Sequence, residues 1–198
     1  MEKPAPAAHP IHELIARRWN SRAIDADRPV TPEMLASLLE AARWAPSSGN
    51  EQPWRFVVFD DRDPAAREQA RDCLTSGNAW ARRAPVLVLS AAESRRARDG
   101  SHNRHAQHDV GLATENLALQ AVAHDLVAHP MAGFDKDRAR AAFGVPESVE
   151  PMAMIAIGYP GDEEALSESQ RAREHAPRER RPITQSAFLG RWDRALPG

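Results

Sequence analysis

The first side chains that could do chemistry in this sequence form a basic cluster over residues 17–22. Three arginines in these six residues are interleaved with Trp19, Asn20 and Ser21. A guanidinium makes forked, charged hydrogen bonds to phosphate, and Asn or Ser side chains add neutral donors. The spacing indicates a phosphate site. A solvated helix end that complements the helix dipole is the alternative interpretation.

A second polar group lies in the loop over residues 45–54, between a predicted helix and a predicted strand. Ser47, Ser48, Asn50 and Gln52 offer the donors and acceptors that the edge of a flat heteroaromatic ring needs. Binding residues often lie on loops that rigid elements position. Turn formation and helix termination explain the same residue types, so both interpretations stay open.

Two further segments complete the candidate set. Residues 129–135 read HPMAGFD, and Gly133 would let the backbone approach a ligand closely, although a tight turn is the alternative. Residues 178–182 read RERRP. Their guanidiniums would complete the phosphate site, unless they form a solvated charge run.

Other reactive side chains point to no separate chemistry. His102, His105 and His108 drift apart at helical spacing, so we expect no metal site. Cys73 is the single cysteine and is expected to be a structural thiol. The dinucleotide, P-loop and GxSxG signatures are absent from the sequence, so a nicotinamide would be a transient visitor.

Composition limits the partners. The chain has 198 residues, of which 42% are hydrophobic and 27% charged, which is typical of a folded domain. A net charge of −2 gives no strong field for nucleic acid or a membrane surface. No apolar run approaches the ~20 residues of a membrane span or the length of a signal peptide. We expect a cytoplasmic protein with neither nucleic-acid nor membrane partners.

Hydrophobic periodicity and turn signals divide the chain into helices and strands. Helices are predicted from Pro10 to Arg18, from Pro32 to Ala45, and over 64–74, 105–127 and 136–143. Strands are predicted over 56–59, 86–91 and 152–157. These are too few strands for a doubly wound sheet, so the pattern favours a helix-rich α+β sandwich.

The long helix and the tail suggest how the domain is organised. The helix over 105–127 is apolar on more than one face, which is typical of a central helix or a subunit interface. From about residue 161 the chain is charged and broken by prolines, with apolar residues near its end. We expect one domain over 1–198, with about ten flexible N-terminal residues and a C-terminal arm from about 161.

Taken together, these segments resemble the nitroreductase family. RRWNSRAID, LLEAARWAPSSGNEQPWRFVVF, HDVGLATENLALQA, HPMAGFD and RERRP follow one another in the family's order and spacing, over about residues 11–191. The resemblance implies an α-β-α sandwich in an intertwined homodimer, with two FMN sites at the subunit interface. It also implies hydride transfer from NADH or NADPH, through flavin N5, to a small acceptor such as a nitroaromatic or a quinone.

The resemblance also assigns the cofactor contacts. The cluster at 18–22 would hold the phosphate and ribityl end, and the tail arginines would close that site. The loop at 46–50 would come from the other subunit, and residues 131–133 would face the isoalloxazine edge, with the Ala132 N–H near N5. No catalytic acid or base is implied, because the chemistry lies on the flavin. The expected cofactor residues are Arg18, Trp19, Asn20, Arg22, Pro46, Ser47, Ser48, Asn50, Met131, Ala132, Gly133, Arg178 and Arg180.

Two departures and several alternatives accompany the resemblance. Asn20 stands where relatives often have serine, and either residue can donate a hydrogen bond. Asp125 stands where relatives usually have glycine, which could alter the turn toward Met131. Flavin fragmentation, dehalogenation and azoline dehydrogenation occur on the same scaffold. A non-catalytic FMN-binding dimer is the alternative outside enzymes.

Overall fold

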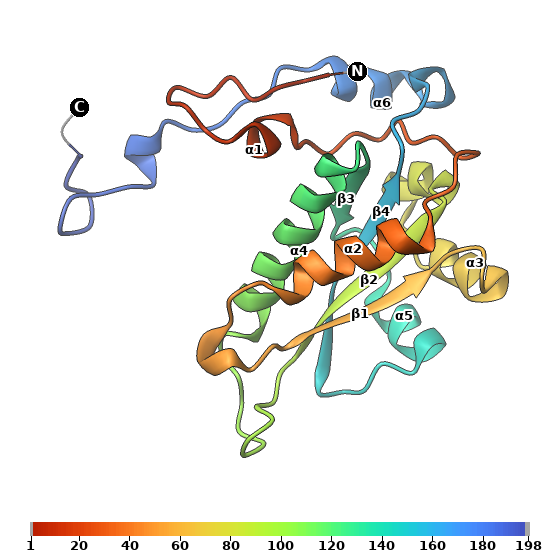
Figure 1. Cartoon of the computed structure of the whole chain (residues 1–198), viewed down its shortest axis with the longest axis horizontal. Helices are drawn as coiled ribbons and strands as arrows, with labels where there is room; N and C mark the ends of the chain where they lie inside the picture. Colours follow the sequence, from red (N-terminus) through yellow and green to blue (C-terminus); the bar gives the residue numbers. More distant parts are fainter. Residues whose placement is uncertain (1, 197–198) are drawn as a thin grey trace.

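The computed structural model describes residues 2–196 (Figure 1). Residues 1, 197 and 198, at the two ends of the expected domain, lie outside the described residues. The helices and 3-10 turns that are not placed in the paragraphs below are α1 (Glu13–Arg17), η1 (Ser48–Asn50), η3 (Glu163–Ala165) and η4 (Ile183–Gln185).

The centre of the molecule is a four-stranded antiparallel sheet in the order β1-β2-β4-β3. The strands are β1 (Trp54–Phe59), β2 (Val86–Glu93), β3 (Val127–Met131) and β4 (Val149–Gly158). Alternate residues of a strand point to opposite faces. In β2, Leu87 and Leu89 therefore belong to one core cluster, and Val86 and Val88 to the other.

Helices cover both faces of this sheet (Figure 1). The helices α2 (Pro32–Arg43) and α4 (Ala106–Ala123) pack against each other and share one core cluster with the sheet. On the other face lie α3 (Pro64–Asp72), η2 (Ser76–Arg83) and α5 (Lys136–Phe143). The structure is thus a mixed helix and antiparallel-sheet sandwich, and the predicted α-β-α architecture is confirmed.

Local signals explain the helix boundaries that were predicted correctly. The Thr31 hydroxyl accepts a hydrogen bond from the Met34 N–H at 3.3 Å, with Pro32 at the first helical position of α2. At α5 the Asp135 carboxylate caps the first turn. Gly144 ends α5 with a φ of 63°, a left-handed conformation that glycine adopts without steric cost.

Two predicted helices differ most from the structure in their boundaries. The predicted helix over 105–127 stops at Ala123, because the chain turns through Asp125 and then forms β3, a strand absent from the prediction. Residues 129–131 of the HPMAGFD segment therefore lie in the sheet. Pro10 lies outside the first helix, since His12 caps α1 by accepting from the Leu14 N–H.

The C-terminal region contains an unpredicted helix, α6 (Glu168–His175), which begins at a capping box of Ser167 and Gln170. After α6 the chain runs away from the sheet, beside the N-terminal segment and α1 (Figure 1). Several of its large apolar side chains are exposed. Trp192 is 80% exposed and Ile183 is 60% exposed.

Candidate functional site

A strongly basic cavity of about 280 Å³ lies where α1, β3 and the C-terminal region meet. Six of its eleven lining residues are Lys or Arg, and none of the eleven is Asp or Glu. The lining includes all six residues predicted for the phosphate end of the cofactor, from both the cluster at 18–22 and the arginines at 178–180. These two groups are more than 150 residues apart in the sequence. The lining residues are Lys3, Arg18, Trp19, Asn20, Arg22, His129, Arg173, Ala176, Pro177, Arg178 and Arg180.

The positive charges of this cavity are only partly neutralised. Arg18 donates from Nη1 to the Asn20 Oδ1 at 2.8 Å, and its Nε lies 3.4 Å from the Glu115 carboxylate. Burial lowers the pKa of Arg178, and the nearby charges of Arg18 and Arg180 lower it further. Guanidiniums that repel one another around a cavity favour an anionic ligand.

Arg178 also organises the backbone around the cavity. It donates to the main-chain carbonyls of Lys3 at 2.6 Å, Ala16 at 2.8 Å and Arg18 at 2.9 Å. These bonds tie the C-terminal tail to the N-terminal segment and to the end of α1. Much of the Arg178 guanidinium is therefore used within the chain, and Arg18 receives its position from it.

Five residues of the cavity lining were missed by sequence reasoning, and three of them have polar side chains: Lys3, His129 and Arg173. The Lys3 ammonium lies 4.9 Å from the centroid of the Trp19 ring, which is cation–π distance. Lys3 belongs to the segment expected to be flexible, and an isolated lysine there gives no signal. His129 belongs to the HPMAGFD segment. Predicting that its side chain faces the cavity would have required knowing that this segment is a strand.

The Pro46–Asn50 loop lies at the other end of α4. The Ser48 N–H donates to the Asp109 Oδ2 at 3.0 Å, near the start of the helix. At the opposite end of α4, Arg17 of α1 pairs with Asp125, just beyond the last turn of α4, at 2.9 Å. Arg18, which lines the basic cavity, pairs with Glu115 in the middle of the helix. Within one chain, none of residues 46–50 lines the basic cavity.

The same loop has an unusual backbone. Gly49, Asn50 and Gln52 all have positive φ, at 63°, 56° and 48°. The Ser47 hydroxyl accepts from the Gln52 N–H at 3.1 Å, and this bond holds the turn closed. Left-handed conformations at residues other than glycine cluster at binding sites, where the surrounding structure enforces them. Pro46, Ser48 and Asn50 are exposed.

The third predicted group continues from the cavity along β3. His129 lines the cavity, and Ala132 follows three residues later, about 10 Å farther along an extended chain. Met131 is buried, whereas Ala132 is exposed. The Gly133 carbonyl accepts from the Thr75 hydroxyl and the Asn78 amide, each at 2.9 Å. The ring-edge group and the basic cavity therefore lie on one continuous edge of the same chain.

Gly133 has a packing reason to be glycine. A Cβ at this position would lie 2.5 Å from the Asn78 Nδ2 and 3.0 Å from the Thr75 Oγ1. The sequence suggested that the backbone at Gly133 approaches another group closely. In the structure, that group is the pair of side chains at the start of η2. This contact fixes the loop after β3 in place.

Comparison with known proteins decides the family. The model of the nitroreductase family matches residues 15–76 and 62–159, which is well over half of the chain. This chain belongs to the nitroreductase family.

Two individual relatives are similar to this chain over most of its length. A Thermus thermophilus protein named NADH dehydrogenase is 31% identical over 166 residues, covering 68% of this chain and 80% of that protein. A Mycolicibacterium smegmatis protein, an uncharacterized 15.4 kDa protein in the ask 5' region, is 43% identical over 149 residues. That match covers 72% of this chain and 99% of the relative.

Solved structures share the fold. A crystal structure described as an oxidoreductase containing FMN has a TM-score of 0.89 at 33% identity, covering 95% of this chain and 96% of that one. A nitroreductase family protein from Clostridium difficile has a TM-score of 0.68 at 24% identity, covering 90% and 96%. The second likeness bears on the fold alone.

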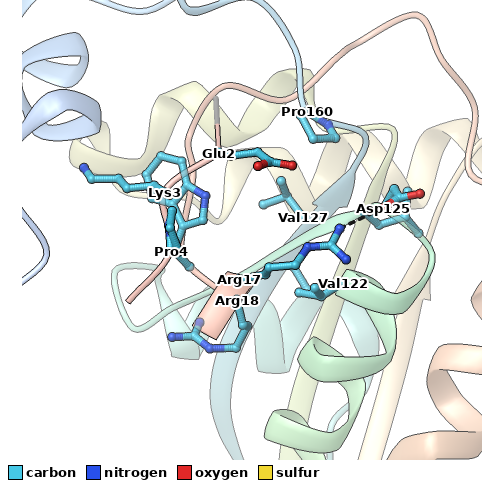
Figure 2. Close-up of a pocket in the computed structure, with 12 residues that line it drawn as sticks. Glu2, Lys3, Pro4, Arg17, Arg18, Val122, Asp125, Val127 and Pro160 are labelled. Atoms are coloured by element: carbon cyan, nitrogen blue, oxygen red, sulfur yellow. Dashed lines mark hydrogen bonds and ion pairs between the residues drawn. The ribbon is translucent and has the colours of Figure 1, made fainter. Parts of the chain in front are cut away.

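Asp125, which stands where the resemblance led us to expect glycine, forms a turn with positive φ. Asp125 adopts a φ of 56°, a left-handed conformation that favours glycine and that Asp tolerates better than most residues. The Leu126 N–H donates to the Ala121 carbonyl at 2.8 Å, which closes the helix end. The Arg17 pair then uses the Asp125 side chain (Figure 2). Asp125 therefore leads into β3 without disturbing it.

Figure 2 also separates the two neighbouring arginines of this nitroreductase family chain. It shows the pocket of about 250 Å³ beside the basic cavity, where Arg17 reaches Asp125 and Arg18 points the other way. Arg17 does not line the basic cavity, whereas Arg18 lines both spaces. The pair offers a matched comparison of one arginine at the predicted phosphate site and one beside it.

His129 and Trp80 pack behind the cavity. Their ring centroids lie 4.7 Å apart, and both side chains are buried. The pKa of His129 is lowered to about 4, chiefly by burial, and the charges of Arg22 and Arg18 act in the same direction. The imidazole is therefore neutral near pH 7. Trp80 packs in the core.

Three other possible features of the described residues are a metal site, a membrane-spanning helix and a reactive cysteine. Within residues 2–196, no three His, Cys, Asp or Glu side chains lie close enough to hold a metal ion. Over the same residues, no helix is both long and apolar enough to cross a membrane. Cys73 is buried, and burial raises the pKa of its thiol. A thiol that is kept protonated is a poor nucleophile, which agrees with the structural role expected for it.

Proposed function

We propose that this protein is an FMN-dependent oxidoreductase that works as a homodimer. It would transfer a hydride from NADH or NADPH to a small acceptor such as a nitroaromatic or a quinone. The observation that carries the proposal is the basic cavity that continues along β3 to Ala132, in a chain of the nitroreductase family. When bound, FMN would supply the hydride chemistry at N5.

The donor set of the cavity fits a phosphate monoester. Arg18 and Arg22 offer charged donors, Asn20 offers a neutral one, and Arg180 approaches from the tail. Trp19 would pack beside the ribityl chain. Arg178 would act mainly through the backbone, because it holds the Arg18 carbonyl at 2.9 Å.

The ring end of the cofactor would lie at the end of β3. Met131, Ala132 and Gly133 would present main chain to the isoalloxazine edge, with the Ala132 N–H as the donor to N5. The contacts of Gly133 to Thr75 and Asn78 support this role, since they hold the loop rigid without a ligand. A preorganised donor orients the ring and tunes its electronics.

The remaining contacts would come from a second copy of the chain. Pro46, Ser47, Ser48 and Asn50 do not line the basic cavity of their own chain. In a homodimer, the loop of one subunit would cover the flavin of the other. The exposed Ile183 and Trp192 support the same arrangement, because an arm with exposed apolar side chains is suited to pack on a partner.

The names of similar proteins agree with this chemistry. NADH dehydrogenase is the name of the Thermus relative, and NAD(P)H nitroreductase is part of the names of others. FMN is named for a solved structure at 33% identity. We also retain as proposals a single domain over 1–198, with its flexible start and its arm, and a cytoplasmic location. Flavin fragmentation, dehalogenation, dehydrogenation and non-catalytic FMN binding remain the alternatives.

An anaerobic assay tests the reaction class. The purified protein with FMN should oxidise NADH or NADPH in stoichiometric amounts alone, and continuously once a nitroaromatic or a quinone is added. The flavin absorbance should return after each turnover. Permanent loss of that absorbance would support fragmentation. Binding of FMN without any nicotinamide oxidation would support the non-catalytic alternative.

Replacing Arg18 by alanine tests the phosphate assignment. Loss of a charged donor should weaken FMN binding by about 2 kcal/mol, or roughly 30-fold in Kd. Arg17→Ala is the matched control, because Arg17 pairs with Asp125 outside the basic cavity. Its Kd should stay within about twofold of the parent value, as for an exposed ion pair. Equal Kd values for all three proteins, measured by flavin fluorescence quenching, would contradict the assignment.

A further inference from the structure

Glu174 is a buried carboxylate in an otherwise exposed part of the chain. It lies near the end of α6 and is only 2% exposed, whereas its helix neighbours Arg173 and His175 are exposed. Burying an ionised carboxylate is costly unless hydrogen bonds and charges compensate for the lost water. The partners that compensate Glu174 therefore indicate what this carboxylate does.

All of those partners belong to residues 21 and 22. Glu174 Oε2 accepts from the Ser21 hydroxyl at 2.7 Å, and Oε1 accepts from the Arg22 N–H at 3.0 Å. The Arg22 guanidinium lies at 3.4 Å from the same Oε1. One carboxylate thus fixes a side chain, a backbone amide and the orientation of an arginine.

The opposite side of the same segment is also held. The Ser21 carbonyl accepts from the His129 Nδ1 at 2.9 Å, and His129 is kept in place by Trp80. The main-chain carbonyl of Glu174 accepts from the Lys3 ammonium. Two residues are therefore clamped between α6 and β3, directly at the basic cavity.

Glu174 itself does not line that cavity, whereas Arg22 does. Its contribution would therefore be indirect. With the carboxylate present, Arg22 keeps a single direction and needs no rearrangement when an anion binds. Without it, the buried Ser21 hydroxyl and the Arg22 N–H lose their acceptor, and the arginine loses its orientation.

We infer that Glu174 is the positioning residue of the phosphate site. Its carboxylate holds Ser21 and Arg22 in the geometry that binds the phosphate, and it couples the docking of the C-terminal region to cofactor binding. The inference rests on the proposed FMN function, and it adds a residue and a dependence on α6 that the cofactor contacts alone do not contain.

The test compares Glu174→Gln with Glu168→Gln, the same substitution at an exposed position of α6. Glutamine keeps one acceptor oxygen but replaces the other with a donor, and it removes the charge. We expect the Kd for FMN to rise roughly tenfold or more in Glu174→Gln, as for a lost charge-assisted hydrogen bond. Binding of riboflavin, which lacks the phosphate, should change by less than about twofold, and Glu168→Gln should match the parent protein.

A loss of affinity of equal size for FMN and riboflavin would overturn the inference, since it would indicate a general structural role. An unchanged affinity for FMN would also overturn it. If Glu174→Gln does not fold, Ser21→Ala provides the test, because it removes one donor to the carboxylate and leaves the backbone in place. It should show the same selective loss for FMN, in a smaller amount, and equal losses for both ligands would overturn the inference.

The proposed function fails separately. A parent protein that binds neither FMN nor riboflavin would overturn both the proposed function and the role of Glu174. The role of Glu174 alone would be overturned by a different result. In that result the parent protein binds FMN far more tightly than riboflavin, and the Glu174→Gln variant keeps the same preference.

Discussion

Gly161→Ala should lower the free energy of unfolding by about 3 kcal/mol, the upper part of the range for overpacked sites. A Cβ on Gly161 would lie 2.4 Å from the Asp25 backbone nitrogen and 2.6 Å from the Ile24 carbonyl carbon. Backbone atoms cannot rotate out of the way as a side chain can. The two chain segments would have to separate.

Separating residues 24–25 from Gly161 would break backbone hydrogen bonds on both sides of the glycine. The Gly161 N–H donates to the Ala23 carbonyl, and the Asp25 N–H donates to the Tyr159 carbonyl, each at 2.9 Å. These bonds hold the strand-like segment that directly follows Arg22 against the end of β4. Gly161→Ala should therefore also weaken FMN binding, through displacement of the basic cluster.

Urea denaturation measures the effect, with Gly77→Ala as the matched control. A Cβ on Gly77 would meet no atom within 4 Å, so this variant should unfold within about 0.5 kcal/mol of the parent. Equal stability of the two variants would show that the contact between Gly161 and residues 24–25 is not maintained in solution.

The second large effect is a pH dependence that comes from His129. Its pKa is lowered from 6.5 to about 4, mainly by burial. Between these values the unfolded chain takes up a proton that the folded protein does not bind. The contribution of His129 to the free energy of unfolding is therefore fully present above pH 6.5 and is lost as the pH decreases. The loss should reach about 2 kcal/mol at pH 5 and roughly 3 kcal/mol below pH 4.

His129→Asn isolates this contribution. The asparagine amide can still donate to the Ser21 carbonyl, which His129 binds at 2.9 Å, but it does not titrate. Other groups titrate in both proteins and cancel in the comparison. Unfolding free energies at pH 7.5 and pH 5 should therefore fall by about 2 kcal/mol less in the variant than in the parent. Parallel pH profiles would mean that His129 is not buried as described.

Local signals in the sequence were sufficient for much of the fold. The cap at Thr31, the proline after it and the stop at Gly144 act within a few residues, so they could be recognised without tertiary information. The strand β3 could not. Its apolar residues continue the pattern of α4, and the strand is selected only by pairing with β4, far along the chain.

The site shows the same division. Residue types alone indicated that clusters at 18–22 and 178–180 suit a phosphate, and the structure brings them to one cavity. The parts that orient them were not predictable. Glu174 is one of many charged residues in a charged segment, and its burial arises only when α6 docks on residues 21–22. Lys3 enters the cavity through an equally distant contact.

In the proposed function, two chains together bind FMN. The most direct measurement combines the flavin absorbance of the purified protein with its mass in solution by light scattering. We expect a yellow dimer that contains about one FMN per chain, or that reaches this ratio when FMN is added. A colourless protein that takes up no FMN, or a monomer that binds FMN with full affinity, would contradict it.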